Sequence, residues 1–180
     1  MKSTRLIVDN HIFLKEIGFN EVEPIFETIV SEREYLGEWL PFVDKTTEIG
    51  YTRGFVTSYL DSDKKDLTLA IYFENKFAGL IGLKDTDIFN KKTEIGYWLS
   101  FKYQHKGIVT KACKTLIAYT FDVMELNRIQ LKAGIENVKS RAIAESLGFQ
   151  LEGIEREGEL HARGYIDLAV YSLLKKEARV

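Results

Sequence analysis

The segment Glu94–Thr110, which reads EIGYWLSFKYQHKGIVT, constrains the fold more than any other part of the chain. An apolar stretch leads into a short basic turn that contains Gly107, and a helix follows the turn and runs to Met124. Such a connection directs free backbone N–H groups, and the positive end of the helix dipole, at one point. Lys102 and Lys106 add positive charge in the turn. The segment therefore predicts a site for a phosphate-bearing ligand; the alternative is a plain connection in which Gly107 only relieves backbone strain.

Two better-known phosphate-binding loops do not match this segment. It lacks both the G-x-x-x-x-G-K-[ST] pattern and the G-x-G-x-x-G pattern. A mononucleotide P-loop and a dinucleotide fold are therefore disfavoured, and a nucleotide-binding protein is only a minor alternative.

Length and composition predict one soluble domain that spans residues 1–180. Apolar residues make up 45% of the chain, which is enough for a hydrophobic core. The net charge of −2 argues against general binding to nucleic acid, which needs many phosphate contacts. No apolar run approaches about 18 residues, and the N-terminal sequence has no apolar segment typical of a signal peptide. We therefore expect no membrane span and a cytoplasmic protein.

The single cysteine and the three histidines carry little functional signal. Cys113 lies inside the predicted helix among apolar residues, which is typical of a small core residue rather than a nucleophile. It cannot form an internal disulfide, which fits a cytoplasmic protein. His11, His105 and His161 are scattered without the spacing of metal ligands, so we expect no zinc site.

The pattern of apolar and turn-forming residues predicts strands and four helices. Arg5–Val8 and His11–Glu16 are expected to form an initial strand, with a bend or hairpin at Asp9–Asn10. Further strands are expected at Asp66–Phe73, Lys76–Lys84, Lys92–Phe101, Arg128–Glu136, Gln150–Glu157 and Gly164–Leu174. The helices are expected at Asn20–Ser31, from Thr46 or Thr47 to Leu60, after Gly107 to Met124, and at Asn137–Leu147.

Local signals supplement this pattern. Asn20 and Thr46 or Thr47 are the expected N-caps, Glu74–Asn75 is the expected hairpin turn, and Gly148 is the expected end of the last helix. The order of elements predicts a mixed α/β (α+β) fold rather than a regular parallel sheet.

With the Gly107 turn, the helix at Asn137 and the LGF sequence at Leu147–Phe149, the chain resembles the GNAT superfamily of acyl-CoA-dependent N-acetyltransferases over nearly its whole length. The family signature has Gln or Arg, two residues, Gly, one residue, and Gly or Ala, between a strand and a helix. Here it reads Gln104-His105-Lys106-Gly107-Ile108-Val109, and Val109 stands where the family has a small residue. The resemblance implies a GNAT-like fold, with a central, mostly antiparallel sheet, one splayed parallel strand pair and flanking helices.

The chain is most similar to the ribosomal-protein N-terminal acetyltransferases of the serine-specific type. Four features in the expected order carry this resemblance. They are TRL at Thr4–Leu6, EWLPF at Glu38–Phe42, the EIGYWL strand, and Asn137-Val138-Lys139-Ser140 with the later LGF and a final strand ending in Tyr171-Ser172-Leu173-Leu174.

The resemblance implies acetyl-CoA as cosubstrate, bound where the strand that ends at Leu99 and the strand Arg128–Glu136 splay apart. Extended backbone near Tyr97 would hold the pantetheine arm, and backbone N–H groups of Lys106–Thr110 would hold the pyrophosphate. Asn137 would bond the pantetheine chain, cap its helix, or do both. The residues implied in cofactor binding are Tyr97, Trp98, Leu99, Gln104, His105, Lys106, Gly107, Ile108, Val109, Thr110 and Asn137.

The resemblance also implies the catalytic residues. Many family members supply the acid from a tyrosine where this chain has Ala144, so Ser140 is the implied hydrogen-bond donor to the departing thiolate. Glu159, expected in a loop after the penultimate strand, is the implied base, acting through a water or after burial has made it more basic. Its alternative role is a solvated loop charge, and Glu94 is a second candidate for the base.

The implied reaction is direct attack of an amine on acetyl-CoA in a ternary complex, without a metal. The favoured acceptor is the α-amine of a protein N-terminus, in particular a ribosomal protein, with Trp39 and Phe42 in the acceptor pocket. Two alternatives stay open: acetylation of a small amine such as a polyamine, an amino acid or an aminoglycoside, and a non-catalytic CoA-binding regulatory module. A homo-oligomer is also possible, because the β-rich C-terminal end offers strand edges.

Overall fold

The computed structural model describes residues 3–63 and 65–178. Of the domain predicted over residues 1–180, Met1, Lys2, Lys64, Arg179 and Val180 lie outside the described residues.

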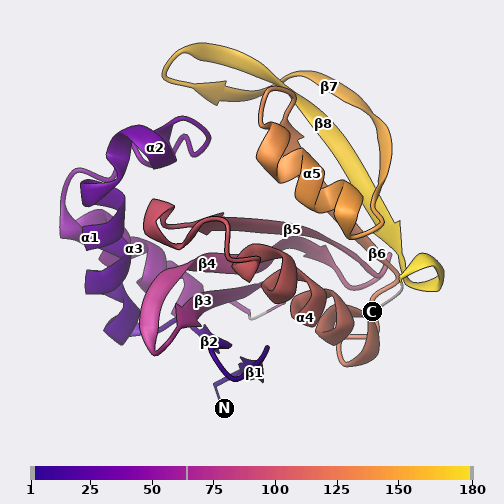
Figure 1. The fold of residues 1–180 in the computed structure, drawn as a ribbon, viewed down its shortest axis with the longest axis horizontal. Helices are drawn as coiled ribbons and strands as arrows, with labels where there is room; N and C mark the ends of the chain where they lie inside the picture. The colour runs from indigo at the N-terminus through magenta and orange to yellow at the C-terminus, as the bar shows by residue number, and fades with distance from the viewer. Residues whose placement is uncertain (1–2, 64, 179–180) are drawn as a thin grey trace.

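The described residues form a single eight-stranded sheet with helices on both faces (Figure 1). The strand order is β1-β2-β3-β4-β5-β6-β8-β7. The strands are β1 (Arg5–Ile7), β2 (Ile12–Glu16), β3 (Leu67–Phe73), β4 (Lys76–Asp87), β5 (Lys92–Leu99), β6 (Arg128–Gly134), β7 (Gln150–His161) and β8 (Gly164–Leu174). The α-helices are α1 (Val22–Ser31), α2 (Arg33–Gly37), α3 (Ile49–Leu60), α4 (Ile108–Asp122) and α5 (Val138–Ser146). Short 3-10 turns are η1 (Phe19–Glu21), η2 (Phe101–Tyr103) and η3 (Lys175–Glu177).

The sheet is antiparallel at every neighbouring pair except β5 and β6, which are parallel. These two strands pair only from Lys92 with Arg128 to Glu94 with Gln130. Beyond that point β5 stays on β4 up to the Leu99–Gly79 pair, and β6 stays on β8 up to the Gly134–Leu168 pair. The mostly antiparallel sheet with a splayed parallel pair is therefore confirmed.

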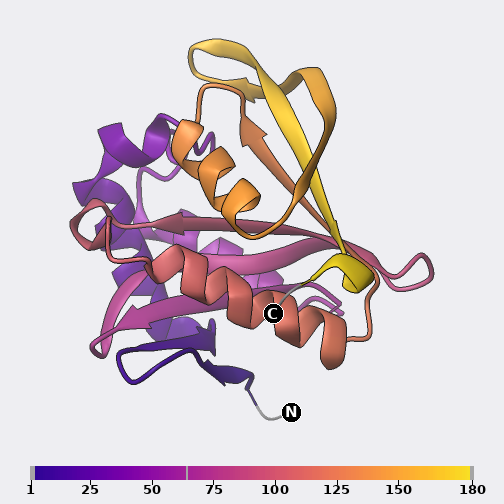
Figure 2. The same ribbon diagram turned by 45° about the vertical axis from the view of Figure 1, so that its right-hand side comes forward.

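Alternation along the central strands divides the core into two layers. Ile71, Ile81 and Ile95 face one side of the sheet and pack with the buried residues of α4. Leu80 and Trp98 face the other side and pack with the buried residues of α1 and α3. Figures 1 and 2 show α4 lying across one face of the sheet while α1 and α3 cover the opposite face. Side chains that alternate along a strand reach opposite faces, which explains this division.

Most of the predicted elements are confirmed, although their ends move by a few residues. Glu74 and Asn75 both take left-handed conformations, with φ of 49° and 61°, as a tight hairpin turn requires. Asn137 caps α5, because its side chain accepts a hydrogen bond from the backbone N–H of Ser140 at 3.1 Å. Gly148, with φ of +85°, follows that helix as predicted.

The two other predicted N-caps are wrong. Asn20 lies within η1, and α1 begins after Glu21, whose carboxylate accepts a 2.8 Å hydrogen bond from the backbone N–H of Gly18. Helix α3 begins after Glu48 rather than after Thr46 or Thr47. The hydroxyl of Thr46 instead donates to the carbonyl oxygen of Phe42 at 2.9 Å. Bonding to a preceding carbonyl is the local alternative that competes with capping.

Four predicted strand ends differ by two residues or more, and the first is that of β4, which continues past Lys84 to Asp87. β5 stops at Leu99 because the chain turns into η2, and β6 stops at Gly134. β7 continues beyond Glu157 to His161, so Glu159 lies on a strand and not in a loop. This last correction matters because it fixes the direction of the Glu159 side chain.

We predict that the substitution Gly79→Ala destabilises the protein strongly. A Cβ at Gly79 would lie 2.2 Å from the carbonyl oxygen of Trp98 on β5, so the β4–β5 pair must move apart. Urea denaturation should show a loss of about 3 kcal/mol in the free energy of unfolding. Gly54→Ala on α3 is the matched control: a Cβ there meets nothing within 4 Å, and we expect a gain of ~0.5–1 kcal/mol. Equal stability of the two variants would contradict the close approach.

Candidate active site

The splay between β5 and β6 opens a cleft of about 910 Å³. Parts of α4, α5, β4, β7, β8 and the segment after α2 complete its walls. Every residue implied in cofactor binding lines this one cleft, as do Glu94, Ser140, Glu159, Trp39 and Leu40. Phe42 does not, and its side chain is among the exposed large apolar groups of the surface.

One end of the cleft is formed by the turn before α4. Gly107 is the N-cap of α4 and takes a left-handed conformation, with φ of +69°. It has no side chain with which to cap the helix, so the first-turn N–H groups of Ile108, Val109 and Thr110 have no intrahelical acceptor. Lys106 and Lys139 line the same end. Free N–H groups, the helix dipole and two cationic side chains together make this end suited to an anion.

Val109, which departs from the family signature, packs into the core on the α4 side and is 9% exposed. The side chain of Val109, which is larger than the Gly or Ala of the family signature, is thus accommodated in the core.

Side chains far away in the sequence hold this turn in place. The carboxylate of Glu32, at the end of α1, accepts hydrogen bonds from the hydroxyl of Ser100 at 2.6 Å and from the backbone N–H of Phe101 at 2.8 Å. Gln104 donates to the hydroxyl of Tyr35 and accepts from Lys139 Nζ at 3.3 Å. Glu32 was missed in the sequence, because nothing local marks a residue whose partner lies 68 positions away.

The opposite wall of the cleft carries a pair of hydroxyl groups. The hydroxyl of Ser140 lies 3.3 Å from the hydroxyl of Tyr97, which in turn lies 3.4 Å from the Ser140 carbonyl oxygen. Burial first, and then the nearby Cys113 thiol, raise the pKa of Tyr97 well above its ordinary value, which the hydrogen bond to Ser140 only partly offsets. Tyr97 therefore keeps its proton at neutral pH. The sequence predicted this residue for its backbone alone and missed its hydroxyl.

Asn137 has the capping role that the sequence predicted and keeps its amide nitrogen available in the cleft. Its side-chain oxygen is used in capping α5, where it accepts from the N–H of Ser140. Its amide nitrogen makes no hydrogen bond to any residue that the structure describes, and Asn137 lines the cleft. The cap thus leaves a donor for a ligand.

Glu159 reaches the cleft because β7 contains a bulge. The pairing with β8 is irregular between Glu155 and Glu159, Glu157 takes a left-handed φ of 52°, and the backbone N–H of Glu157 donates to Asp167 at 2.7 Å. Bulges re-aim side chains and are common beside functional sites. The Glu159 carboxylate accepts a 2.7 Å hydrogen bond from the buried His161, which the sequence gave no reason to select.

Glu94 lies near the closed end of the cleft, where β5 and β6 still pair. Its carboxylate contacts Lys84 Nζ at 2.9 Å and Gln130 Nε2 at 3.2 Å. Burial by itself lowers the pKa of Lys84, but the hydrogen bond and the charge of Glu94 outweigh it and raise that pKa, with smaller contributions from Asp85 and Glu159. Glu94 is thus already paired with a lysine, whereas Glu159 is not.

Comparisons with known proteins place the chain in a family. Residues 11–150 match the family model described as the acetyltransferase (GNAT) domain. The chain belongs to the GNAT acetyltransferases. It is 35% identical to the "putative ribosomal N-acetyltransferase YdaF" of Bacillus subtilis, over 94% of each protein. It is 28% identical to the "ribosomal-protein-serine acetyltransferase" of Escherichia coli, over 92% of this chain and 93% of that protein.

A solved structure extends the likeness to the fold and to the cosubstrate. The crystal structure of the microcin C7 self immunity acetyltransferase MccE, in complex with acetyl-CoA and AMP, superposes with a TM-score of 0.88 at 28% identity. The match covers 93% of this chain and 94% of that one. GNAT acetyltransferases use acetyl-CoA, and this chain is accordingly an acyltransferase of the N-acetyltransferase type.

Other chemistries find little support in the structure. Cys113 is fully buried, and burial raises the pKa of its thiol, so it is not a nucleophile. Within residues 3–63 and 65–178, no group of three or more potential His, Cys, Asp or Glu ligands could hold a metal ion. No helix in the described part of the chain is long and apolar enough to cross a membrane.

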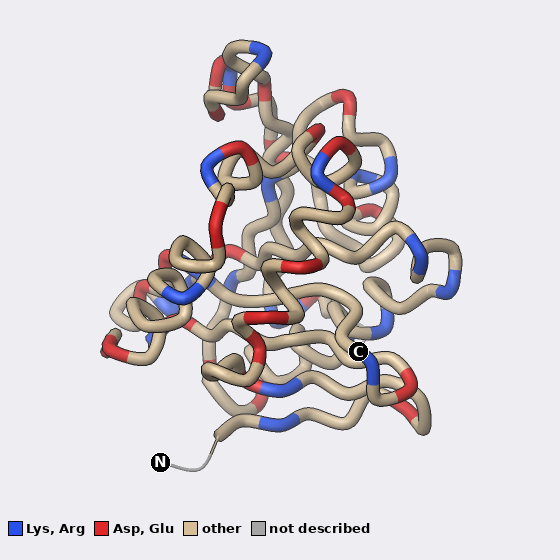
Figure 3. The backbone as a smooth tube through the Cα atoms, turned by 90° about the vertical axis from the view of Figure 1, so that its left-hand side faces the viewer, with Lys and Arg blue, Asp and Glu red and all other residues tan. Residues whose placement is uncertain are grey.

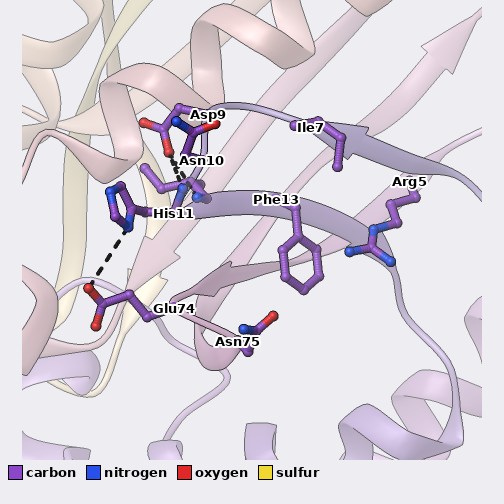
Figure 4. A pocket seen from close by; sticks show the side chains of 9 residues that line it. Arg5, Ile7, Asp9, Asn10, His11, Phe13, Glu74 and Asn75 are labelled. Atoms are coloured by element: carbon purple, nitrogen blue, oxygen red, sulfur yellow. Dashed lines mark hydrogen bonds and ion pairs between the residues drawn. The ribbon is translucent and has the colours of Figure 1, made fainter.

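A second hollow, of about 480 Å³, lies over the β1–β2 hairpin and the β3–β4 turn (Figure 4). Several of its polar groups are engaged: Asp9 accepts the backbone N–H groups of His11 and Ile12, and His11 lies 4.0 Å from Glu74. Arg5 stands over the ring of Phe13, 4.3 Å from its centroid. None of the predicted site residues lines this hollow.

We predict that Gly107→Ala weakens acetyl-CoA binding by about 5- to 30-fold. A left-handed conformation costs a residue with a Cβ ~1–2 kcal/mol, so the free variant relaxes to another turn conformation and binding must restore the original one. Gly107→Asn is the control, since asparagine tolerates this conformation and should retain most of the affinity. Isothermal titration calorimetry measures both dissociation constants. Parental affinity in the alanine variant would show that the turn does not bind the ligand.

Proposed function

We propose that the protein transfers the acetyl group of acetyl-CoA to the α-amine of a protein N-terminus, with a ribosomal protein as the acceptor. The observation that carries this proposal is the opposite charge of the two ends of the cleft. The names of the two relatives, a putative ribosomal N-acetyltransferase and a ribosomal-protein-serine acetyltransferase, support the choice of acceptor.

The end of the cleft away from α4 is acidic. Three carboxylates that line the cleft, Asp85, Glu94 and Glu159, act on Lys84 there. Glu38, Glu136 and Lys132 also line the cleft. Both lysines are already paired with glutamates, Lys84 with Glu94 at 2.9 Å and Lys132 with Glu155 at 2.7 Å. The excess of negative charge attracts a protonated amine, while the basic turn at the other end suits the phosphates of acetyl-CoA.

The wall of the acidic end also has an apolar part. The ring of Trp39 lies against Gly134, where an added Cβ would come within 3.0 Å of it, and Arg163 lies over the same ring at 5.1 Å from its centroid. Trp39 therefore closes the acidic end on the side of the β7–β8 turn. Basic and acidic residues are interspersed elsewhere along the chain (Figure 3), so the attraction is local to the cleft.

Glu159 acts as the base. An amine must lose a proton before its lone pair can attack. An α-amine has a pKa near ~7.7–8.0, so it gives up that proton near neutral pH more readily than a lysine side chain does. Glu159 lines the cleft, its side chain is 39% exposed, and one of its oxygens accepts from His161. The other oxygen takes the proton through a water. Glu94 is less suited to this role because Lys84 and Gln130 occupy its carboxylate.

Ser140 and Tyr97 stabilise the departing thiolate. Acetyl-CoA supplies the activated acetyl group; the amine nitrogen bonds to its carbonyl carbon as the carbon–sulfur bond breaks. Ser140 occupies the first turn of α5, so its hydroxyl and the positive end of that helix act at the same point. The hydroxyl of Tyr97, which keeps its proton, supports that of Ser140 at 3.3 Å.

Acetylation of a small amine is the second candidate, because an acidic lining also suits a polyamine or an aminoglycoside.

We predict that peptides beginning with Ser or Ala are acetylated faster than spermidine, free amino acids and aminoglycosides at equal concentrations. Release of the CoA thiol gives the rate, and mass spectrometry of the peptides locates the acetyl group on the α-amine or on a lysine. Turnover of a small amine with inert peptides would overturn the choice of acceptor. Acetyl-CoA binding without any turnover would favour a regulatory module.

We predict that Glu159→Gln and Ser140→Ala each lower kcat by about 100-fold, the usual contribution of one acid–base or charge-stabilising group. Both variants should bind acetyl-CoA with nearly parental affinity, because neither residue lies at the basic end of the cleft. Cys113→Ala is the control and should retain the parental kcat, because that thiol is buried in the core. Parental turnover by Glu159→Gln would reassign the base, with Glu94→Gln as the next variant to measure.

A further inference from the structure

His161 has no part in the mechanism above, yet it is one of the few buried polar residues of the molecule. Its side chain is 3% exposed, and its Nε2 atom lies 2.7 Å from the Glu159 carboxylate. Both residues are on β7, two positions apart, so their side chains project from the same face of the strand. The contact between Glu159 and His161 therefore follows from the regular strand geometry of β7 after the bulge.

The environment of the ring fixes which nitrogen faces Glu159. Nδ1 of His161 is buried and has no hydrogen-bond partner in the described part of the chain. A carboxylate can only accept a hydrogen bond, so the nitrogen that faces Glu159 must carry a proton. A proton on Nδ1 alone would leave the lone pair of Nε2 against the carboxylate. The geometry therefore makes Nε2–H the donor to Glu159.

The same geometry decides which of the two residues faces the substrate. Glu159 lines the cleft and His161 does not. Because Nε2 is bound to Glu159 and Nδ1 is buried, neither ring nitrogen is available to take a proton from an acceptor amine. His161 therefore acts only through Glu159.

We propose that His161 is a positioning residue: its Nε2–H holds one carboxylate oxygen of Glu159 and directs the other into the acidic end of the cleft. This inference rests on the proposed role of Glu159 as the base. A glutamate has three rotatable side-chain bonds, and a nearby cation offers it a competing position, because the charge of Glu159 acts on Lys84. A misplacement of 1 Å in a catalytic group can cost about 100-fold in rate.

Two substitutions separate the hydrogen bond from the packing. His161→Leu fills a similar volume without a donor, and His161→Gln places an amide N–H near the position of Nε2. We expect His161→Leu to lower kcat by about 10- to 100-fold with an unchanged KM for acetyl-CoA, and His161→Gln to recover most of the loss. Equal activity in the leucine variant and the parent, or an equal loss in both variants, would overturn the proposal.

A double-mutant cycle distinguishes this proposal from a purely structural effect. If His161 acts through Glu159, His161→Leu has no further effect on the residual rate of Glu159→Gln. If it only supports the fold, the two losses multiply, and the proposal fails. Full activity of Glu159→Gln would instead show that the proposed base is wrong.

A spectroscopic measurement does not depend on turnover. Nitrogen NMR of the 15N-labelled protein, with the His161 signals assigned by their absence in His161→Leu, reports the tautomer at neutral pH. We expect a protonated Nε2 in the parent, and a shift of the Nε2 signal in Glu159→Gln. The Nδ1–H tautomer, with no proton on Nε2, would overturn the inference even if no acceptor amine had been found.

Discussion

The site depends on the short pairing between β5 and β6. The two strands share a ladder for only three residue pairs, from Lys92–Arg128 to Glu94–Gln130. Each strand then keeps its other neighbour, β4 for β5 and β8 for β6. The splay therefore removes hydrogen bonds only between β5 and β6. The backbone of β5 between Gly96 and Leu99 has a free edge that faces the cleft. An exposed strand edge binds an extended chain through backbone hydrogen bonds, which fits the pantetheine arm of acetyl-CoA.

The positions of the helices follow from this arrangement. α4 begins in the turn after β5, and α5 begins in the turn after β6, so the N-termini of both helices lie at the cleft. The first turn of α4, behind Gly107, offers free N–H groups at the basic end. The first turn of α5, capped by Asn137, places Ser140 opposite Tyr97 on β5. Two positive helix ends thus meet at the cleft, an arrangement that suits a cosubstrate that carries phosphates and releases a thiolate.

The sequence predicted what is encoded locally. The strand–turn–helix at Gly107, the hairpin turn at Glu74–Asn75 and the Asn137 cap depend on neighbouring residues, and the structure has them all. The cap at Thr46 failed because its hydroxyl bonds to the carbonyl oxygen of Phe42 instead, and the cap at Asn20 failed because Asn20 lies within η1 and α1 begins after Glu21. Glu159 was selected as a residue but expected in a loop, because a bulge that prolongs a strand leaves no clear periodicity. Glu32 and the hydroxyl of Tyr97 were missed because their partners lie 68 and 43 positions away.

This chain lacks the tyrosine that many family members have on the helix corresponding to α5, and the same geometry brings another tyrosine hydroxyl close to Ser140. Ala144, where many family members have that tyrosine, is completely buried in the core, so α5 uses this position for packing. The hydroxyl of Tyr97 comes instead from β5, the strand whose free edge would hold the pantetheine arm. If acetyl-CoA binds along that edge, the same backbone would position both the sulfur and the Tyr97 hydroxyl, and movement of α5 would change the Ser140 contact alone. Pre-organisation of this kind lowers the cost of orienting the donor during the reaction.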